Sequence, residues 1–156
     1  MTVSIAVDSP LTGEVRALIA ELNATLDVLT PPEFCFHMTV EQMADPTVTV
    51  FVARDAAGRS VGMGSLKEHG EGLGEVKRMF TRPELRGQRI GARLLARIEA
   101  LARERRVSRL VLETGEGHGF EPAWRVYERG GFRTCGALLD YPDSGYSRFY
   151  EKILAP

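Results

Sequence analysis

The sequence predicts a mixed α/β protein in which a central sheet carries helices on both faces. Short segments that alternate polar and apolar residues are typical of half-buried strands. Longer segments whose apolar residues recur every three or four positions are typical of amphipathic helices. Their order along the chain is strand, two helices, three strands, helix, strand, helix and two strands. This interleaving predicts one sheet covered by helices.

The N-terminal part supplies the first strand and two helices. Residues 3–7 alternate weakly and form the expected strand. Thr12 is a candidate N-cap, and apolar residues at helical spacing follow it through Asp27. A Pro-Pro pair at 31–32 ends that helix, and residues 37–44 are expected to form a second, short one.

Three strands follow in quick succession and predict an antiparallel meander. They cover residues 47–54, 60–68 and 73–81, joined by glycine-containing turns at 56–58 and 70–74.

The C-terminal half begins with a long predicted helix over residues 87–106. Its apolar face carries Ile90, Leu94, Ile98 and Leu101, and arginines at 89, 93 and 97 line another face. The remaining elements are a buried strand at 110–113, a helix at 121–129 and strands at 132–136 and 147–154.

Length and composition predict a single domain over residues 1–156. The chain is 44% hydrophobic and 26% charged, with a net charge of −1, so no overall basic field favours nucleic acid or membrane. No apolar run approaches the roughly 18 residues of a membrane span, and no signal peptide is evident. Cys35 and Cys135 are expected to be reduced thiols without metal-ligand spacing, which predicts a cytoplasmic protein without a metal.

The segment where the third meander strand leads into the long helix is the most informative. Residues 86–92 offer free backbone N–H groups, the positive end of a helix dipole and arginine side chains. That combination predicts a site for an anionic phosphate group. A P-loop and a dinucleotide fingerprint are both excluded by the missing Lys-Ser/Thr and glycines. A tight turn with solvated arginines remains the simpler alternative.

The same segment resembles the GNAT superfamily of acyl-CoA N-acyltransferases. The resemblance rests on Arg86, Gly87 and Gly91, on the preceding Val-Lys-Arg-Met-Phe at 76–80, and on the Val-Tyr-Glu-Arg-Gly-Gly-Phe at 126–132. Arg89 departs from the family pattern, because it stands where the first of two glycines is usual. The resemblance implies the GNAT fold, with a mixed, mostly antiparallel sheet of about seven strands.

The resemblance also implies acetyl-CoA as cosubstrate. The strand at 75–81 would part from the strand at 110–113 around a bulge near Arg78 and Met79, and its exposed backbone would pair with pantetheine. A backbone N–H near Met79 or Phe80 would polarise the thioester carbonyl. The implied cofactor-binding residues are Met79, Phe80 and Thr81 on the strand, Arg86, Gly87, Gln88, Arg89, Ile90, Gly91 and Ala92 at the turn, and Tyr127. The arginines at 89, 93, 97 and 103 of the following helix are expected where the cofactor phosphates would lie, the alternative being a local RNA-binding patch.

Two residues are the candidate catalytic groups. By resemblance, Tyr127 would protonate the departing CoA thiolate, although a half-buried core tyrosine is the alternative. Glu75 begins the strand lining the acceptor side and is the candidate base for the amine, the alternative being a rim carboxylate. Glu113 is the second candidate base, and His118 the third. Neither cysteine has a histidine partner, so direct attack in a ternary complex is expected.

The acceptor would be a primary amine of a small molecule or peptide. Its pocket is expected between residues 31–37 and 140–145. Aromatic and acidic side chains there that could contact it are Phe34, Phe36, His37, Tyr141, Tyr146, Asp140 and Asp143. Trp124 is expected to be a packing residue of its helix.

A homodimer is possible, and nucleic acid is an unlikely partner. The rival function is a non-catalytic acyl-CoA sensor or partner module of the same fold.

Overall fold

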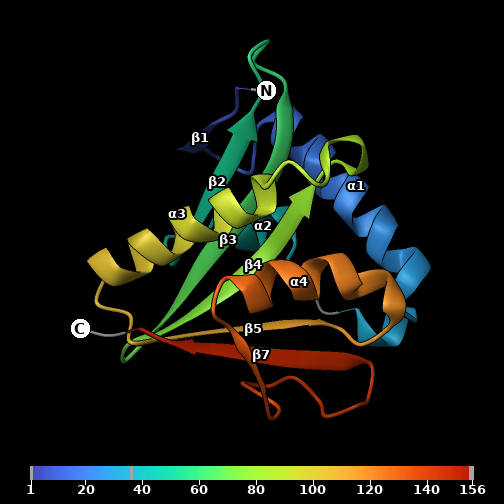
Figure 1. Ribbon diagram of the computed structural model, residues 1–156, viewed down its shortest axis with the longest axis vertical. Coiled ribbons are helices and arrows are strands. Elements are labelled where there is room, and N and C mark those ends of the chain that lie inside the picture. Colours follow the sequence, from blue (N-terminus) through green and yellow to red (C-terminus); the bar gives the residue numbers. More distant parts are fainter. Residues whose placement is uncertain (1, 36, 155–156) are drawn as a thin grey trace.

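A computed structural model describes residues 2–35 and 37–154, which form a seven-stranded sheet in the order β1-β2-β3-β4-β5-β7-β6 (Figure 1). The β4–β5 pair is parallel and the other neighbours are antiparallel. The predicted mixed, mostly antiparallel sheet is therefore confirmed. The strands are β1 (Ser4–Val7), β2 (Val48–Arg54), β3 (Ser60–Gly70), β4 (Leu73–Thr81), β5 (Arg109–Gly115), β6 (Arg133–Cys135) and β7 (Ser147–Ile153).

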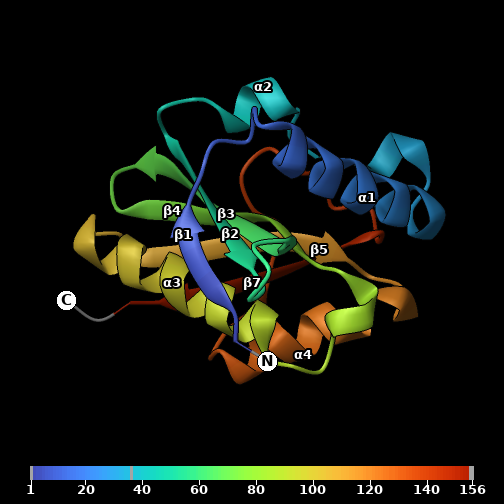
Figure 2. The ribbon, with the colours of Figure 1, turned by 90° about the horizontal axis from the view of Figure 1, so that it is seen from above.

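Helices cover both faces of the sheet (Figure 2). Helices α3 (Ile90–Glu104) and α4 (Glu121–Arg129) lie on one face, and α1 (Gly13–Leu29) and the short α2 (Val40–Met43) lie on the other. Each face has its own apolar core, the larger one under α3 and α4. Three 3₁₀ turns, at Pro32–Phe34, Pro83–Leu85 and His118–Phe120, complete the secondary structure.

The helix predicted from residue 87 begins three residues later, and that prediction was wrong at its start. Gly87 and Arg89 have φ of 88° and 63°, values that an α-helix excludes. Arg89 is instead the N-cap of α3, without a side-chain capping bond. The missing glycine of the sequence pattern thus corresponds to a left-handed backbone position that an arginine occupies here.

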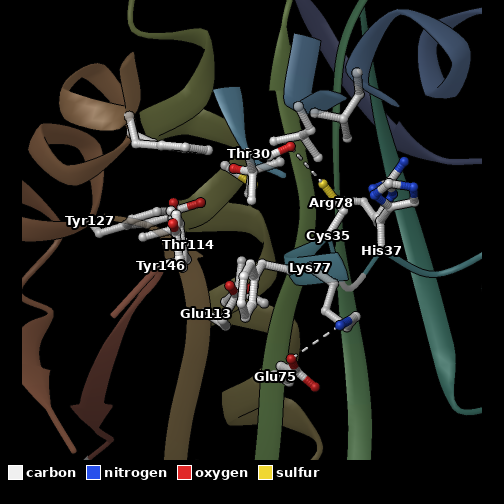
Figure 3. Close-up of a pocket in the computed structure, with 18 residues that line it drawn as sticks. Thr30, Cys35, His37, Glu75, Lys77, Arg78, Glu113, Thr114, Tyr127 and Tyr146 are labelled. Carbon is white, nitrogen blue, oxygen red and sulfur yellow. Dashed lines mark hydrogen bonds and ion pairs between the residues drawn. The ribbon is translucent and has the colours of Figure 1, made fainter. Parts of the chain in front are cut away.

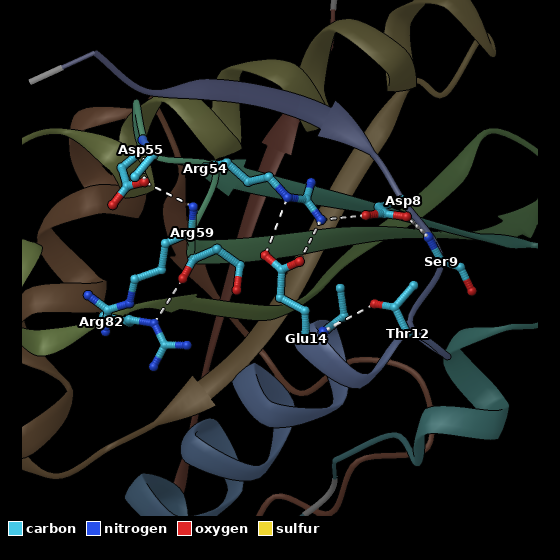
Figure 4. Close-up of polar contacts among 11 residues, drawn as sticks. Asp8, Ser9, Thr12, Glu14, Arg54, Asp55, Arg59 and Arg82 are labelled. Atoms are coloured by element: carbon cyan, nitrogen blue, oxygen red, sulfur yellow. Dashed lines mark hydrogen bonds and ion pairs between the residues drawn. The ribbon is translucent and has the colours of Figure 1, made fainter.

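Polar contacts hold β1 and α1 to the sheet (Figure 4). Arg54 at the end of β2 forms ion pairs with Asp8 (2.6 Å) and with Glu14 of α1 (3.3 Å). The Thr12 hydroxyl accepts a hydrogen bond from the N–H of Val15 and caps α1 as predicted. None of the helices in the described part of the chain is long and apolar enough to cross a membrane.

Candidate active site

The strands β4 and β5 diverge in the middle of the sheet, as their arrows in Figure 1 show. Their parallel pairing ends at Glu75, which lies opposite Val111, and no further bridge joins them among the described residues. A cavity of about 140 Å³ lies at this opening, lined by parts of β4, β5, α1 and α4 (Figure 3). The parting of these two strands, expected from the resemblance, is confirmed.

A β-bulge interrupts β4 just beyond this point. The register with β3 shifts between Met63 and Ser65, so that Gly64 alone faces Arg78 and Met79. Arg78 has a left-handed backbone, with φ of 58°. A Cβ on Gly64 would lie 2.4 Å from Sδ of Met79, so a larger residue there would force the Met79 side chain to move. The predicted bulge is therefore confirmed at these residues.

Helix α4 places Tyr127 at the cavity. The side chain is 7% exposed, and its ring lies 5.9 Å from that of Tyr150 between centroids. Burial raises the pKa of the hydroxyl well above its ordinary value, and the nearby Glu113 adds to this. Within residues 2–35 and 37–154 the hydroxyl has no hydrogen-bond partner. Tyr127 therefore presents a protonated, unengaged hydroxyl.

Glu75 lies at the same cavity, but its carboxylate is already engaged. One oxygen is 2.9 Å from Nε2 of His69. The other accepts hydrogen bonds from the Tyr141 hydroxyl (2.6 Å) and from Nζ of Lys77 (3.3 Å). Glu75 is 2% exposed and also lines a second cavity, of about 450 Å³, beside α2. These three contacts hold the carboxylate in place where it lines both cavities.

Glu113, near the end of β5, has the less crowded carboxylate. Among the described residues its hydrogen-bond partner is the hydroxyl of Ser147, which donates to it at 2.7 Å. Burial raises the pKa of Glu113, an effect that the Ser147 hydrogen bond and the charge of Lys77 partly oppose. Glu113 and Tyr127 line one cavity from β5 and α4. A carboxyl with a raised pKa there is suited to accept a proton near neutral pH.

The turn before α3 retains the features of an anion site. The first hydrogen bond of the helix runs from the Arg93 N–H to the Arg89 carbonyl, at 3.0 Å, so the amides just before Arg93 have no intrahelical acceptor. Gly87 is exposed, and a Cβ there would meet nothing within 4 Å. The amide of Arg86 is already used, because it donates to the Pro83 carbonyl at 3.3 Å. Arg86 can therefore contribute its side chain to the site.

Two of the helix arginines have a different role from the one expected. The expectation that Arg93 and Arg97 lie at the phosphate site was wrong. Arg93 donates to the carbonyl of Val3 at 2.9 Å, and Arg97 to that of Ile5 at 2.8 Å. Both guanidinium groups therefore hold β1 against α3, and only Arg86 and Arg89 remain at the turn.

The expected aromatic residues divide between the two cavities. Phe34 and Tyr146 stack with their centroids 4.4 Å apart and line the first cavity with His37. Tyr141 lines the second cavity, where its hydroxyl contacts Glu75, and Asp140 lies there too. Asp143 is exposed and lines neither, and Phe36 lies outside the described residues.

Two further side chains behave as the simpler interpretations predicted. The His118 side chain is 96% exposed, lies 3.1 Å from Glu121 and lines neither cavity. Trp124 donates to the Gly115 carbonyl at 2.9 Å and packs α4 against the end of β5. Both cysteines are free thiols, and no three His, Cys, Asp or Glu side chains gather as a metal site within the described chain.

Sequence reasoning missed the role of two charged side chains of the cavity and the partner of one of them. Lys77 was treated only as part of a motif and Arg78 only as a bulge position, and Asn23 was not considered. Only the fold brings Asn23 to Arg78, 55 positions apart, where it accepts a hydrogen bond from the guanidinium. A charged residue in a strand of otherwise buried residues was the available signal.

Comparison with known proteins assigns the family. The model of the acetyltransferase (GNAT) family matches residues 17–132. IAA acetyltransferase of Azospirillum brasilense is 41% identical over 97% of this chain and 98% of its own. The crystal structure of a candidate acyl-CoA N-acyltransferase from Klebsiella pneumoniae has a TM-score of 0.83 and 34% identity, covering 99% of both chains. N-acetylglutamate synthase of Neisseria gonorrhoeae, solved with coenzyme A and N-acetyl-glutamate, shares the fold with a TM-score of 0.75 and 20% identity, over 100% of this chain and 36% of that one.

Proposed function

The chain belongs to the GNAT family of acetyltransferases, and from this premise we propose that it moves an acetyl group from acetyl-CoA to a primary amine. The observation that carries the proposal is the junction of three features at one opening in the sheet. These are the unpaired edge of β4, the Tyr127 hydroxyl and the carboxyl of Glu113. The anion site precedes α3, the helix that packs beside α4 on the same face of the sheet.

The residues present fit the cosubstrate. The free amides of the turn and of the first turn of α3, with the side chains of Arg86 and Arg89, would hold the pyrophosphate. The β4 edge over Met79, Phe80 and Thr81 would pair with the pantetheine amides as an added strand does. The side chain of Phe80 is buried in the core, so its backbone is the part that would take part. Bound there, acetyl-CoA supplies an activated acetyl thioester.

Acid and base roles follow from the environments of the side chains. Tyr127 keeps its proton at neutral pH and would donate it to the departing thiolate. Glu113 is our preferred base for the amine, because its raised pKa and single hydrogen bond leave it able to accept a proton. Glu75 stays the alternative. Its three contacts favour a positioning role through Lys77 and Tyr141.

The size of the cavity favours an amine of a small molecule over an amine carried by a protein. Its volume of about 140 Å³ is below the roughly 300–1,000 Å³ of pockets that hold drug-sized ligands. An amine of a small molecule, attacking the thioester directly in a ternary complex, fits this space. IAA belongs in the test panel, since it stands in the name of the 41% identical relative.

The decisive experiment measures turnover and acetyl-CoA affinity in the same variant. Tyr127→Phe should lower kcat about 10²- to 10⁴-fold in a thiol-release assay, because only the donated proton is lost. Its affinity for acetyl-CoA, measured by calorimetry, should stay unchanged. Tyr150→Phe is the matched control, because that hydroxyl bonds to Glu128, and its turnover should persist.

Two outcomes would contradict the proposal. Equal turnover in Tyr127→Phe and the parent would remove the acid from the mechanism. Binding of acetyl-CoA without turnover of any acceptor, in the parent as well, would favour the non-catalytic sensor. Arg86→Glu completes the set, because it should abolish acetyl-CoA binding while leaving the fold intact.

A further inference from the structure

The first cavity contains a buried arginine that the mechanism above does not use. Arg78 lies at the bulge of β4 and is 7% exposed. It lines the cavity on the side of α1, across from Tyr127 (Figure 3). Burial lowers the pKa of its guanidinium to about 10, so the group still carries its charge at neutral pH.

This guanidinium is poorly satisfied. One terminal nitrogen donates to the side-chain oxygen of Asn23, whereas Nε is buried without an acceptor. No carboxylate of residues 2–35 and 37–154 forms an ion pair with it. Buried arginines are ordinarily paired, because an isolated buried charge is destabilising. Arg78 therefore has a buried donor without an acceptor, on a residue that lines the cavity.

The other charged groups of the cavity are already engaged. Glu75 accepts from Lys77 and Tyr141, and Glu113 accepts from Ser147. His37 does not compete for an anion, since burial and the charge of Arg78 lower its pKa. Arg78 is thus the strong cation of this cavity that lacks an anionic partner among the described residues.

The bulge explains how the side chain reaches this position. Met79 packs against the core under α3, and Phe80 belongs to the core under α1. The extra residue at the bulge lets Arg78 face α1 as Lys77 does, at the cost of a left-handed backbone. Backbone strain and an unpaired buried charge occur together at one residue, a combination found at functional sites.

We propose that Arg78 binds a carboxylate of the acceptor, so that the acceptor is a small amino-carboxylate. The planar guanidinium offers parallel N–H donors that match the two oxygens of a carboxylate. The amine would then lie toward Tyr127 and Glu113, and the rest of the molecule against Leu22, Leu26 and the Phe34–Tyr146 stack. The position of the amine in this inference rests on the proposed function, whereas the binding of the carboxylate to Arg78 does not.

Binding of product-like probes tests the proposal without turnover. The probes are N-acetyl-L-alanine, N-acetyl-β-alanine, 4-acetamidobutyrate and 4-acetamidobenzoate, each paired with its neutral carboxamide. Calorimetry with CoA present should show at least one acid binding about 10- to 100-fold tighter than its amide. Arg78→Met should remove that preference, whereas Arg59→Met, on an exposed arginine paired with Glu84, should keep it.

The stability of the variant separates recognition from a structural role. If Arg78 serves a ligand, Arg78→Met should keep or raise the Tm, because an unpaired buried charge is replaced by an apolar side chain of similar length. A lower Tm with an unchanged acid preference would overturn the proposal. So would equal binding of acids and amides, or no binding of any acid. If the parent protein binds an acid in preference to its amide but shows no acetyl-CoA turnover, the proposed function fails and the carboxylate site stands, since acid binding is measured separately.

Discussion

Arg89 occupies a left-handed backbone position, and replacing it with glycine should stabilise the protein. Its φ of 63° and ψ of 19° cost a residue with a Cβ about 1–2 kcal/mol. Glycine removes that cost but gives the unfolded chain about 0.4–1 kcal/mol more conformational entropy. The midpoints of the two ranges leave a net gain of about 0.8 kcal/mol. The side chain makes no capping bond and is exposed, so its loss subtracts little.

Thermal unfolding followed by circular dichroism measures this gain. For a chain of this size, Arg89→Gly should raise the Tm by about 1–4 °C. Arg89→Ala is the matched control, because it removes the same side chain and keeps the strained backbone, so it should give no rise. A glycine variant no more stable than the alanine variant would refute the strain argument. Acetyl-CoA affinity should fall equally in both, if the Arg89 side chain contacts phosphate.

Three further predictions concern titration and packing. Glu113→Gln should remove the acid limb of the kcat/KM profile, which in the parent should lie above the ordinary glutamate range because the pKa is raised. Gly64→Ala should cost about 1–3 kcal/mol in urea unfolding, since its Cβ would lie 2.4 Å from Sδ of Met79; adding Met79→Ala should recover part of the loss. The hydrogen bond from Arg54 lowers the pKa of Asp8, so this ion pair stabilises the fold above the unfolded pKa of about 3.8 and is lost as pH falls through the lower folded value. Asp8→Asn should therefore cost about 1 kcal/mol or less at neutral pH and nothing at low pH.

Local sequence patterns predicted the elements well, because each depends on nearby residues. The strands of the meander follow from alternation, and α1 follows from its cap at Thr12 and its apolar spacing. The start of α3 was missed because an arginine in a left-handed conformation leaves no local signal. Helix propensity depends on the type of side chain, whereas the start of α3 is set by the backbone conformation of Arg89.

Long-range contacts explain what could not be predicted at the site. Arg93 and Arg97 looked like phosphate ligands, yet their acceptors on β1 are about 90 positions away. Glu75 looked like a free base, and only the fold brings Tyr141 to it. The unpaired state of Arg78 is likewise a property of its surroundings. Spacing can identify a residue that is able to act, but its partners decide what it does.

The two α3 arginines that bond to the backbone at β1 also bear on how copies of this chain can associate. The N–H of Asp8 bonds to the Val50 carbonyl, so even-numbered residues of β1 face β2 and the carbonyls of Val3 and Ile5 face outward. Those are the acceptors that Arg93 and Arg97 occupy. A strand from another molecule would have to displace two guanidinium groups before it could extend the sheet at this edge. The β1 edge thus carries its own barrier to edge-to-edge pairing, and β6 is the other edge strand of the sheet.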